Sequence, residues 1–229
     1  AWPVGTRCRL GRDRLTEMLT LEALAELFAE HHQAALTPVS PLRIADEQVD
    51  TDREPMIMGT VNLSRDSTYR ESIAVSTASA VRKARVMWEQ GAGLIDIGAE
   101  SSTAKAARVD ATGQIALLRP VIQALHQSGV RVSAETYEPV VAEASLRAGA
   151  SVINLTGREH ERAIFDLVAA ANATVIICFV PSTNVREIAD AATAPDPIPG
   201  LIAHFTERVR VAREHGVDRI VIDPGLGFY

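Results

Sequence analysis

The sequence predicts an α/β protein built on a parallel β-sheet, which either closes as a (β/α)8 barrel or stays open as a doubly wound layer. Short apolar segments alternate with helical segments from residue 55 onward, as connected parallel strands require. The strand segments are almost continuously apolar, which is typical of a parallel sheet covered by helices. The first strand leads into NLSRDST, without the glycine-rich turn of a dinucleotide-binding fold.

The alternation from residue 55 comprises six strands and five helices. Gly91 is a suitable stop for the first of these helices, and Pro139 lies in the first turn of the third. We expect strands at 55–62, 93–101, 130–136, 151–157, 174–180 and 218–225, and helices at 72–92, 112–129, 138–149, 159–172 and 198–216.

The first 54 residues have a different pattern, and we interpret 1–54 as an N-terminal helical extension and linker preceding the α/β domain at 55–229. Apolar residues recur at helical spacing over 19–36, where Thr20 is a suitable N-cap. The next segment reads TPVSPLRIADEQVDTDREP, with three prolines and many charges, and is typical of a linker.

Composition excludes several classes of protein. The net charge is −6 with no basic stripe, and aromatic residues make up only 4%, which argues against nucleic-acid binding. No apolar run approaches the ~20 residues that cross a membrane, and the first residues lack the apolar core of a signal peptide. Cys178 lies inside the apolar run TVIICFV, as expected of a buried reduced thiol. We therefore expect a cytoplasmic protein that uses neither a membrane nor nucleic acid.

Polar side chains follow the apolar strands, at the edge where ligands of parallel sheets gather. A polar group beside a buried strand is costly unless it is hydrogen-bonded, so its repetition on one rim predicts a polar small-molecule pocket. Each such residue can alternatively cap a helix or pin a loop. The strand-end residues are Asn62, Asp96, Glu100, Ser101, Ser102, Glu135, Asn154, Asp223 and the region of Cys178.

The types of residue on this rim suggest the chemistry of its ligand. No His or Cys cluster has the spacing of a zinc site, and no Ser-His-Asp set can be assembled. Carboxylates and amides in fixed positions suit a flat heterocycle with an amidine edge, such as a guanine or a pterin. A carboxylate pairs with the ring N–H and the exocyclic NH2, and an amide reads the remaining edge.

Five motifs carry a resemblance to a known family: MIMGTVNLSRDS, GAGLIDIGAESS, VSAETY, GASVINLTG and VIDPGLGF. In order and spacing they resemble the dihydropteroate synthases, which are pterin-binding TIM barrels, and the likeness covers residues 55–229. The resemblance implies the closed barrel. It also makes the Asp-Pro-Gly strand the sixth of eight, so we expect the chain to be incomplete, or a partner or the N-terminal segment to close the gap.

The resemblance implies a role for each matching residue. Asp223 and Asn154 hold the pterin ring, and Asp223 together with Glu135 stabilises a cationic pterin during the reaction. Asn62 lies near the diphosphate and a magnesium ion, so Mg2+ is the expected cofactor. Asp96 belongs to the IDIGAES motif and is counted among the substrate-binding residues.

Other matching positions depart from the family pattern. Ser102 keeps a hydroxyl where the family has Thr, and Cys178 stands where a Met packs against the ring. The first loop reads Ser-Arg-Asp-Ser-Thr in place of Thr-Pro-Asp-Ser-Phe, and the Arg of the second loop is replaced by Thr103. Arg65 and Lys105 are candidates to replace the missing cations.

The resemblance implies a transferase that joins a hydroxymethyl-dihydropterin diphosphate to 4-aminobenzoate in folate biosynthesis. Because both loops differ, two alternatives stay open: a paralogue with another acceptor, similar to methyltetrahydrofolate methyltransferases, or a non-catalytic pterin-binding protein. The expected partner is a small pterin substrate. Members of the family commonly form dimers, so a homodimer is a possible assembly.

Overall fold

The computed structural model describes residues 20–64, 70–74, 76–101, 107–180, 182–184 and 197–226. The chain divides into two compact units, Ala1–Val39 and Ser40–Tyr229. In the first unit, helix α1 spans Leu21–Ala35 and begins where expected, because Thr20 Oγ1 accepts a hydrogen bond from Ala23 N at 3.1 Å. None of its residues is buried. No helix among the described residues has the length and apolarity needed to cross a membrane.

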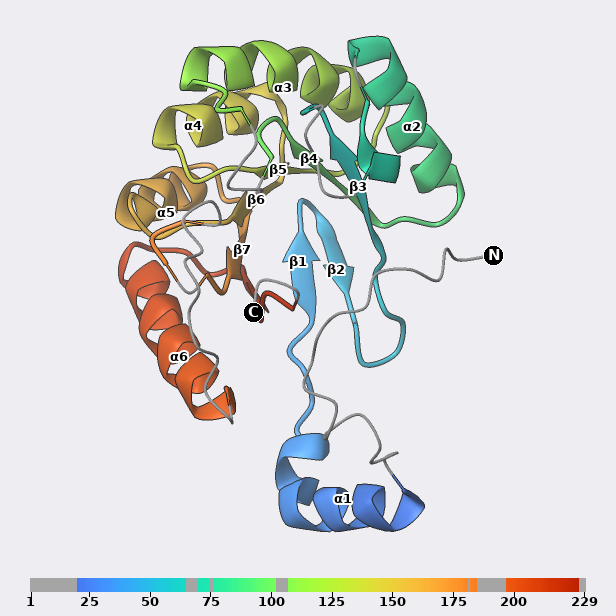
Figure 1. Ribbon diagram of the computed structural model, residues 1–229, viewed down its shortest axis with the longest axis vertical. Coiled ribbons are helices and arrows are strands. Elements are labelled where there is room, and N and C mark those ends of the chain that lie inside the picture. Colours follow the sequence, from blue (N-terminus) through green and yellow to red (C-terminus); the bar gives the residue numbers. More distant parts are fainter. Residues whose placement is uncertain are drawn as a thin grey trace. The chain divides into compact units, whose positions relative to one another are not determined.

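The second unit contains a parallel six-stranded sheet in which the strands are neighbours in chain order. This order is the one that successive βα units produce. The strands curve around a common centre (Figure 1). Their bounds are β3 Met58–Asn62, β4 Leu94–Gly98, β5 Val132–Glu135, β6 Val152–Leu155, β7 Thr174–Cys178 and β8 Ile220–Asp223.

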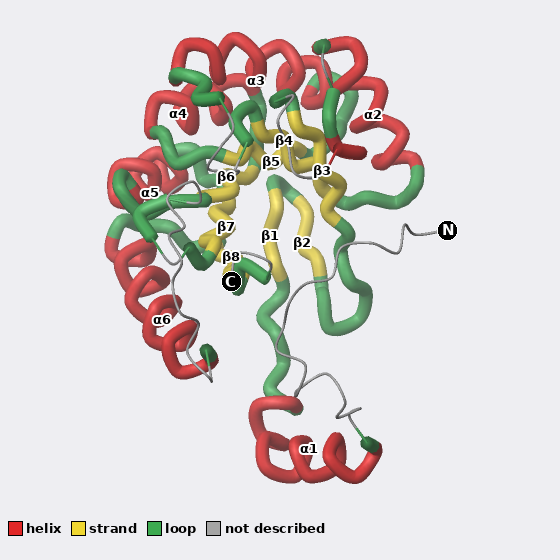
Figure 2. Tube along the Cα trace, viewed as in Figure 1, coloured by secondary structure: helices red, strands yellow, loops and turns green. Residues whose placement is uncertain are grey.

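Five helices follow the strands and form the outer layer (Figure 2). They are α2 Thr77–Glu89, α3 Ala111–His126, α4 Pro139–Ala148, α5 Glu161–Ala170 and α6 Ile198–Glu214, and a 3-10 turn, η1, spans Arg70–Ser72. Helix α2 begins later than predicted, because Ser76 and Ser79 form a capping box that fixes its first turn. Gly91 has φ 102° just after α2, which confirms it as a stop.

The two faces of the sheet bury different side chains, because successive residues of a strand point to opposite sides. The outer face is apolar and packs with the helices in one core, which includes Ile95, Ile97, Ile153, Leu155, Val175 and Ile177. The alternate residues, among them Asp96, Glu135, Asn154 and Asp223, therefore face the concave side. The helix-facing surface supplies most of the hydrophobic burial, and the carboxyl end of the concave surface is left for polar chemistry.

A short β-hairpin lies in the segment that the sequence presented as a linker. Strands β1 (Leu42–Ile44) and β2 (Glu47–Val49) pair antiparallel, and they join through Ala45, whose φ is 52°. Ile44 is only 2% exposed and packs with Leu94, Val152 and Ile176 near the starts of the barrel strands. The hairpin thus closes the amino-terminal end of the sheet and belongs to the unit that begins at Ser40, so the expected linker up to residue 54 is structured there.

Candidate functional site

Polar side chains from neighbouring strands meet at the carboxyl end of the sheet. The register makes cross-strand neighbours of four residues in successive strands: Asn62, Gly98, Glu135 and Asn154. Cys178 and Asp223 are paired in the same way at the ends of β7 and β8. The structure therefore gathers the strand-end residues on one rim, which is where parallel-sheet proteins place their ligands.

The floor of this rim is a hydrogen-bonded pair that spans three strands. Asn154 on β6 donates from Nδ2 to Asp96 Oδ2 on β4 at 3.2 Å. Strand β5 lies between β4 and β6, so the two side chains meet over the concave face of β5, beside Ser133. Ser133 lowers the pKa of Asp96, although its hydroxyl makes no hydrogen bond of standard geometry there.

Asp96 is 4% exposed, and burial raises its pKa from 3.8 to about 6. The hydrogen bond from Asn154 and the nearby hydroxyl of Ser133 oppose this rise, and the nearby charge of Asp223 adds to it. Asp96 is therefore a carboxyl whose charge state changes just below neutral pH. A ligand that donates hydrogen bonds or carries positive charge would favour its ionised form.

Glu135 at the end of β5 is shifted further in the same direction. Burial, followed by the charge of Asp96, raises its pKa from 4.5 to about 8, while Thr156 lowers it and Glu100 raises it. Its carboxyl lies against Gly98, where an added Cβ would stand 2.5 Å from Glu135 Oε2. Gly98 thus leaves the space that the Glu135 carboxyl occupies. At neutral pH the free protein holds a proton on this group.

Asp223 and Cys178 form the next part of the rim. Asp223 Oδ1 accepts a hydrogen bond from Gly225 N at 2.9 Å, so the carboxylate fixes the turn that follows β8. Cys178 is a free, buried thiol, and burial, followed by the charge of Asp223, raises its pKa. A thiol held neutral in this way offers packing surface and no nucleophile.

Asn62 ends β3 on the same rim and is buried. Its Oδ1 accepts a hydrogen bond from Ser64 N at 2.9 Å, which fixes the start of the loop after β3. The other three predicted substrate-binding residues, Arg65, Ser102 and Lys105, lie outside the described residues. Within the described part of the chain, no three His, Cys, Asp or Glu side chains are arranged to hold a metal ion.

Three buried polar atoms at the centre of the rim lack a hydrogen-bond partner: Asp96 Oδ1, Asn154 Oδ1 and Ser133 Oγ. Buried polar groups in folded proteins are nearly always paired, so such atoms need an explanation. Two of them are acceptors, and they lie within one hydrogen-bonded pair. The arrangement is suited to a ligand that presents several N–H donors along one edge.

Comparison with known proteins agrees with a site of this kind. A family model described as "Pterin binding enzyme" matches residues 58–229, well over half of the chain. This chain belongs to that family. The resemblance to the dihydropteroate synthases is confirmed, because relatives with that name match most of the pterin-binding region.

Three relatives of this chain illustrate the similarity. The dihydropteroate synthase of Bacillus subtilis is 31% identical over 178 residues, which make up 76% of this chain and 59% of that protein. The synthase of Xanthomonas albilineans, solved with 4-aminobenzoic acid, is 31% identical with a TM-score of 0.69, over 83% of this chain and 68% of that one. The Thermus thermophilus synthase, solved in complex with 6HMPPP, is 28% identical with a TM-score of 0.66, over 83% and 66%.

The chain therefore has the TIM-barrel fold of these relatives, and the open doubly wound alternative is wrong. Its six parallel strands correspond to strands of that barrel. The chain spans 59% to 68% of the three relatives described.

Several residues of the rim were not predicted from the sequence. Ser133 and Thr156 adjust the pKa values of Asp96 and Glu135. Of these two residues, Ser133 could have been identified from the sequence, because a polar residue inside the apolar segment VSAE is unusual. Tyr137 and Arg208 make contacts around the rim that depend on where loops meet in space, and no spacing in the sequence signals them.

Proposed function

We propose that this chain carries the pterin site of a dihydropteroate synthase, a transferase that joins a hydroxymethyl-dihydropterin diphosphate to 4-aminobenzoate. The observation that carries the proposal is the Asp96–Asn154 pair, whose buried acceptor atoms lack partners beside Glu135 and Asp223. A pterin ring supplies the missing donors through its ring N–H groups and its exocyclic amino group.

The described residues divide the recognition of the ring between them. The Asp223 carboxylate would accept two N–H donors from the amidine edge, which is a charge-assisted and directional pairing. Asp96 accepts from Asn154 Nδ2 and thereby orients the amide, so that Asn154 Oδ1 remains available as an acceptor. Because the site is buried, each of these hydrogen bonds discriminates strongly against a ring that lacks the matching group.

The reaction breaks the bond between the pterin methylene carbon and the diphosphate oxygen. Diphosphate leaves with the electron pair of the broken bond. The aminobenzoate nitrogen then forms a bond to that carbon and loses a proton to solvent. Positive charge develops on the pterin as the bond breaks, and fixed carboxylates beside the ring stabilise it. Glu135 and Asp223 would carry this role, with Glu135 giving up its proton to solvent as the ring becomes cationic.

The proposal includes Mg2+ on the diphosphate side of the site. Mg2+ prefers oxygen ligands and usually takes several of them from phosphates and water, so the single Asn62 amide suits it. When bound, Mg2+ would neutralise charge on the leaving diphosphate. We assign Arg65 and Lys105 to the same anionic group, and Ser102 and Cys178 to the surroundings of the ring.

We also propose a cytoplasmic location and a homodimeric assembly. The free thiol of Cys178 supports a reducing compartment, although burial alone would preserve it. Fractionation of cells that express the protein tests the location. Sedimentation equilibrium of the purified chain tests the assembly, and a monomer at micromolar concentration would contradict it.

Calorimetry with a hydroxymethyl-pterin diphosphate analogue tests the function, with and without Mg2+. We expect micromolar binding by the wild type that weakens about tenfold or more in Asp223→Asn, because a charge-assisted pair is lost. Asp218→Asn, an exposed aspartate just before β8, is the matched control and should bind normally. Binding followed by diphosphate release only when 4-aminobenzoate is present supports the synthase. Binding of methyltetrahydrofolate with no response to 4-aminobenzoate would replace it with the methyltransferase-like alternative, and no binding by folded protein would reject both.

A further inference from the structure

A second cluster of buried polar side chains lies in the helical layer, where α5 and α6 pack beside the end of β7. Seven buried side-chain nitrogen and oxygen atoms among the described residues lack a hydrogen-bond partner. Three belong to the rim, and the other four belong to Glu161, His204 and Arg208. Because buried polar atoms are nearly always paired, this cluster needs an explanation as much as the rim does.

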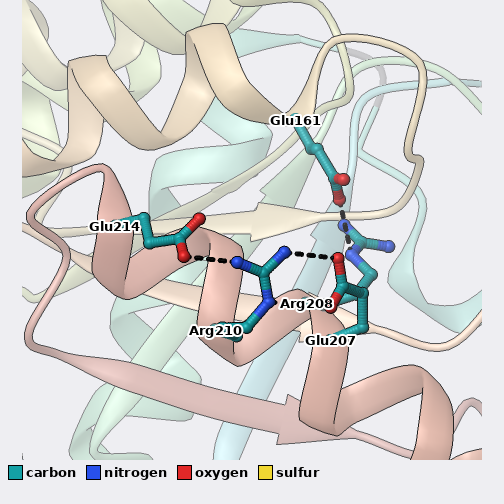
Figure 3. A network of polar contacts seen from close by, with 5 residues as sticks. All are labelled: Glu161, Glu207, Arg208, Arg210 and Glu214. Atoms are coloured by element: carbon teal, nitrogen blue, oxygen red, sulfur yellow. Dashed lines mark hydrogen bonds and ion pairs between the residues drawn. The ribbon is translucent and has the colours of Figure 1, made fainter.

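Arg208 on α6 is the most deeply buried member of the cluster. Its side chain is only 4% exposed, and its Nη2 donates to Gly157 O at 3.3 Å. Its Nε lies 2.6 Å from Glu161 Oε2 at the start of α5, as an ion pair that lacks the alignment of a hydrogen bond (Figure 3). Its Nη1 is buried and has no partner. One N–H group of a buried guanidinium is therefore left to donate.

Arg210, two residues further along α6, has a different environment. Its side chain is half-exposed and pairs with Glu207 and Glu214 of its own helix (Figure 3). Two carboxylates thus serve the exposed guanidinium, whereas one carboxylate serves the buried guanidinium of Arg208. A buried charge is costly unless its hydrogen-bonding groups are satisfied, so Arg208 Nη1 is the atom that a further acceptor would satisfy.

His204 lies four residues before Arg208 and therefore on the same face of α6. Its ring makes edge contacts with Phe179 and Phe205, at centroid distances of 4.9 and 5.2 Å, and its Nε2 is buried without a partner. Burial, followed by the charges of Arg208 and Arg158, lowers the pKa of His204 to about 4. The ring is therefore neutral at pH 7, and Nε2 donates a hydrogen bond in the tautomer that carries its proton there.

Arg158, in the loop after β6, supplies the exposed side of the cluster. Its backbone N donates to Thr183 O at 2.6 Å, which fixes this part of the loop. Its charge lowers the pKa of both His204 and Arg208, so its guanidinium lies near both. Arg158 and Arg208 carry two positive charges against the single negative charge of Glu161. The cluster thus has an excess of positive charge, with one cation buried and one exposed.

We propose that Arg208, His204 and Arg158 form a binding site for a small oxyanion with the chemistry of phosphate. Arg208 Nη1 would donate to the anion from the buried side, His204 Nε2 from α6, and Arg158 from the exposed side. Arginine suits an oxyanion because its planar group can donate to two oxygens at once. Glu161 is paired with Arg208 Nε, so it offsets one positive charge and leaves the other for the anion.

Inorganic phosphate is the probe, added to the purified full chain in a buffer without other oxyanions. NMR of the histidine rings reads the site locally, with the His204 signals assigned by their loss in His204→Phe. Bound phosphate should shift these signals and raise the pKa of His204 from about 4, because a nearby negative charge favours the protonated ring. Calorimetry measures the affinity, which we expect to be millimolar or tighter.

Two arginine variants and one control test the donors. Arg158→Ala should weaken phosphate binding about tenfold, the scale of a lost hydrogen bond between charged groups. Arg208→Lys keeps the charge but removes the Nη1 donor, so we expect weaker binding there too. Arg210→Ala removes an exposed arginine of the same helix and should bind phosphate as the wild type does.

Three outcomes would overturn the inference. Unchanged His204 signals in folded wild type at saturating phosphate would show that the buried donors do not bind an oxyanion. Equal weakening in Arg158→Ala and Arg210→Ala would reduce the binding to general surface attraction. Loss of the His204 shift in Asn62→Ala would place the phosphate on the concave rim. None of these measurements uses a pterin, so the oxyanion site and the proposed synthase function can fail separately.

Discussion

Asn154 and Asp96 stand 58 residues apart in the chain, yet Asn154 Nδ2 donates to Asp96 Oδ2 at 3.2 Å across the concave face of the barrel. Their strands, β4 and β6, are not neighbours but flank β5. The two side chains therefore meet only because the sheet is assembled. Their remaining oxygens, Asp96 Oδ1 and Asn154 Oδ1, are buried without partners. The pair is therefore incomplete in the free protein, and under the proposed function a pterin ring completes it.

Asn154→Ala should weaken the proposed pterin site and also destabilise the fold. The substitution removes the hydrogen bond that Asp96 Oδ2 accepts from Asn154 Nδ2. The loss of a partner for this buried oxygen costs about 1–3 kcal/mol of unfolding free energy. We expect analogue affinity to fall at least tenfold, because the orienting amide is lost. Calorimetry and urea unfolding measure the two effects. The double variant with Asp96→Asn gives the coupling, and additive losses would mean that the two side chains act independently.

The stability of the free protein should fall as pH rises from about 4 to about 8. Asp96 and Glu135 have folded-state pKa values of about 6 and about 8, raised mainly by burial from 3.8 and 4.5. Between the unfolded and folded values, the folded state binds more protons, so raising the pH through this window removes stability. We expect a loss on the order of 2 kcal/mol, kept modest because Glu135 is partly exposed.

The variant Asp96→Asn/Glu135→Gln isolates this effect, because neither amide titrates. Urea unfolding at pH 5, 6, 7 and 8 should show a smaller decline for the variant than for the wild type. Parallel curves for the two proteins would mean that these carboxyls have ordinary pKa values. Saturating pterin analogue should also flatten the wild-type curve, since a donor-rich ligand favours the ionised carboxyls.

Gly98→Ala should change the ligand site without unfolding the barrel. The new Cβ would stand 2.5 Å from Glu135 Oε2, which is the movable end of a side chain. The Glu135 carboxyl must turn away, so we expect weaker analogue binding and a lower apparent pKa of Glu135, as its burial decreases. Infrared titration of the carboxyl and calorimetry measure the two changes. Gly200→Ala on α6, where nothing lies within 4 Å of the added Cβ, is the control. Normal binding in Gly98→Ala would show that the position of the Glu135 carboxyl is not critical.

The barrel could be predicted from the sequence because its strands and helices carry strong local signals. Thr20 and Pro139 mark helix starts as expected. The hairpin was missed because its turn carries no such signal: Ala45 adopts φ 52°, where Asn or Gly is usual. Each of its strands is only three residues long, too short to show an alternating pattern.

The position of the site could also be predicted from the sequence, but the contacts around it could not. Strand-end polar residues identify the rim, because side-chain direction follows from strand geometry. The partners around the rim were not predictable. Arg208 is one charged residue on a helix that carries several, and only the packing of α5 against α6 selects it for burial. The Tyr137–Glu100 bond joins two loops whose paths depend on the assembled barrel.

Ile44→Ala should destabilise the barrel from the end opposite to the site. Ile44 is 2% exposed and fills the space between Leu94, Val152 and Ile176, while Thr174 Oγ1 donates to Arg43 O at 2.7 Å and holds the hairpin there. Truncating a buried isoleucine costs about 2–5 kcal/mol, because packing is lost and a cavity remains. Ile57→Ala, at a position that is 65% exposed, is the matched control and should cost little. Urea unfolding measures the loss, and analogue affinity should stay unchanged, since the proposed pterin-binding residues lie at the other ends of the strands. Equal stability of the two variants would mean that the hairpin does not seal the barrel.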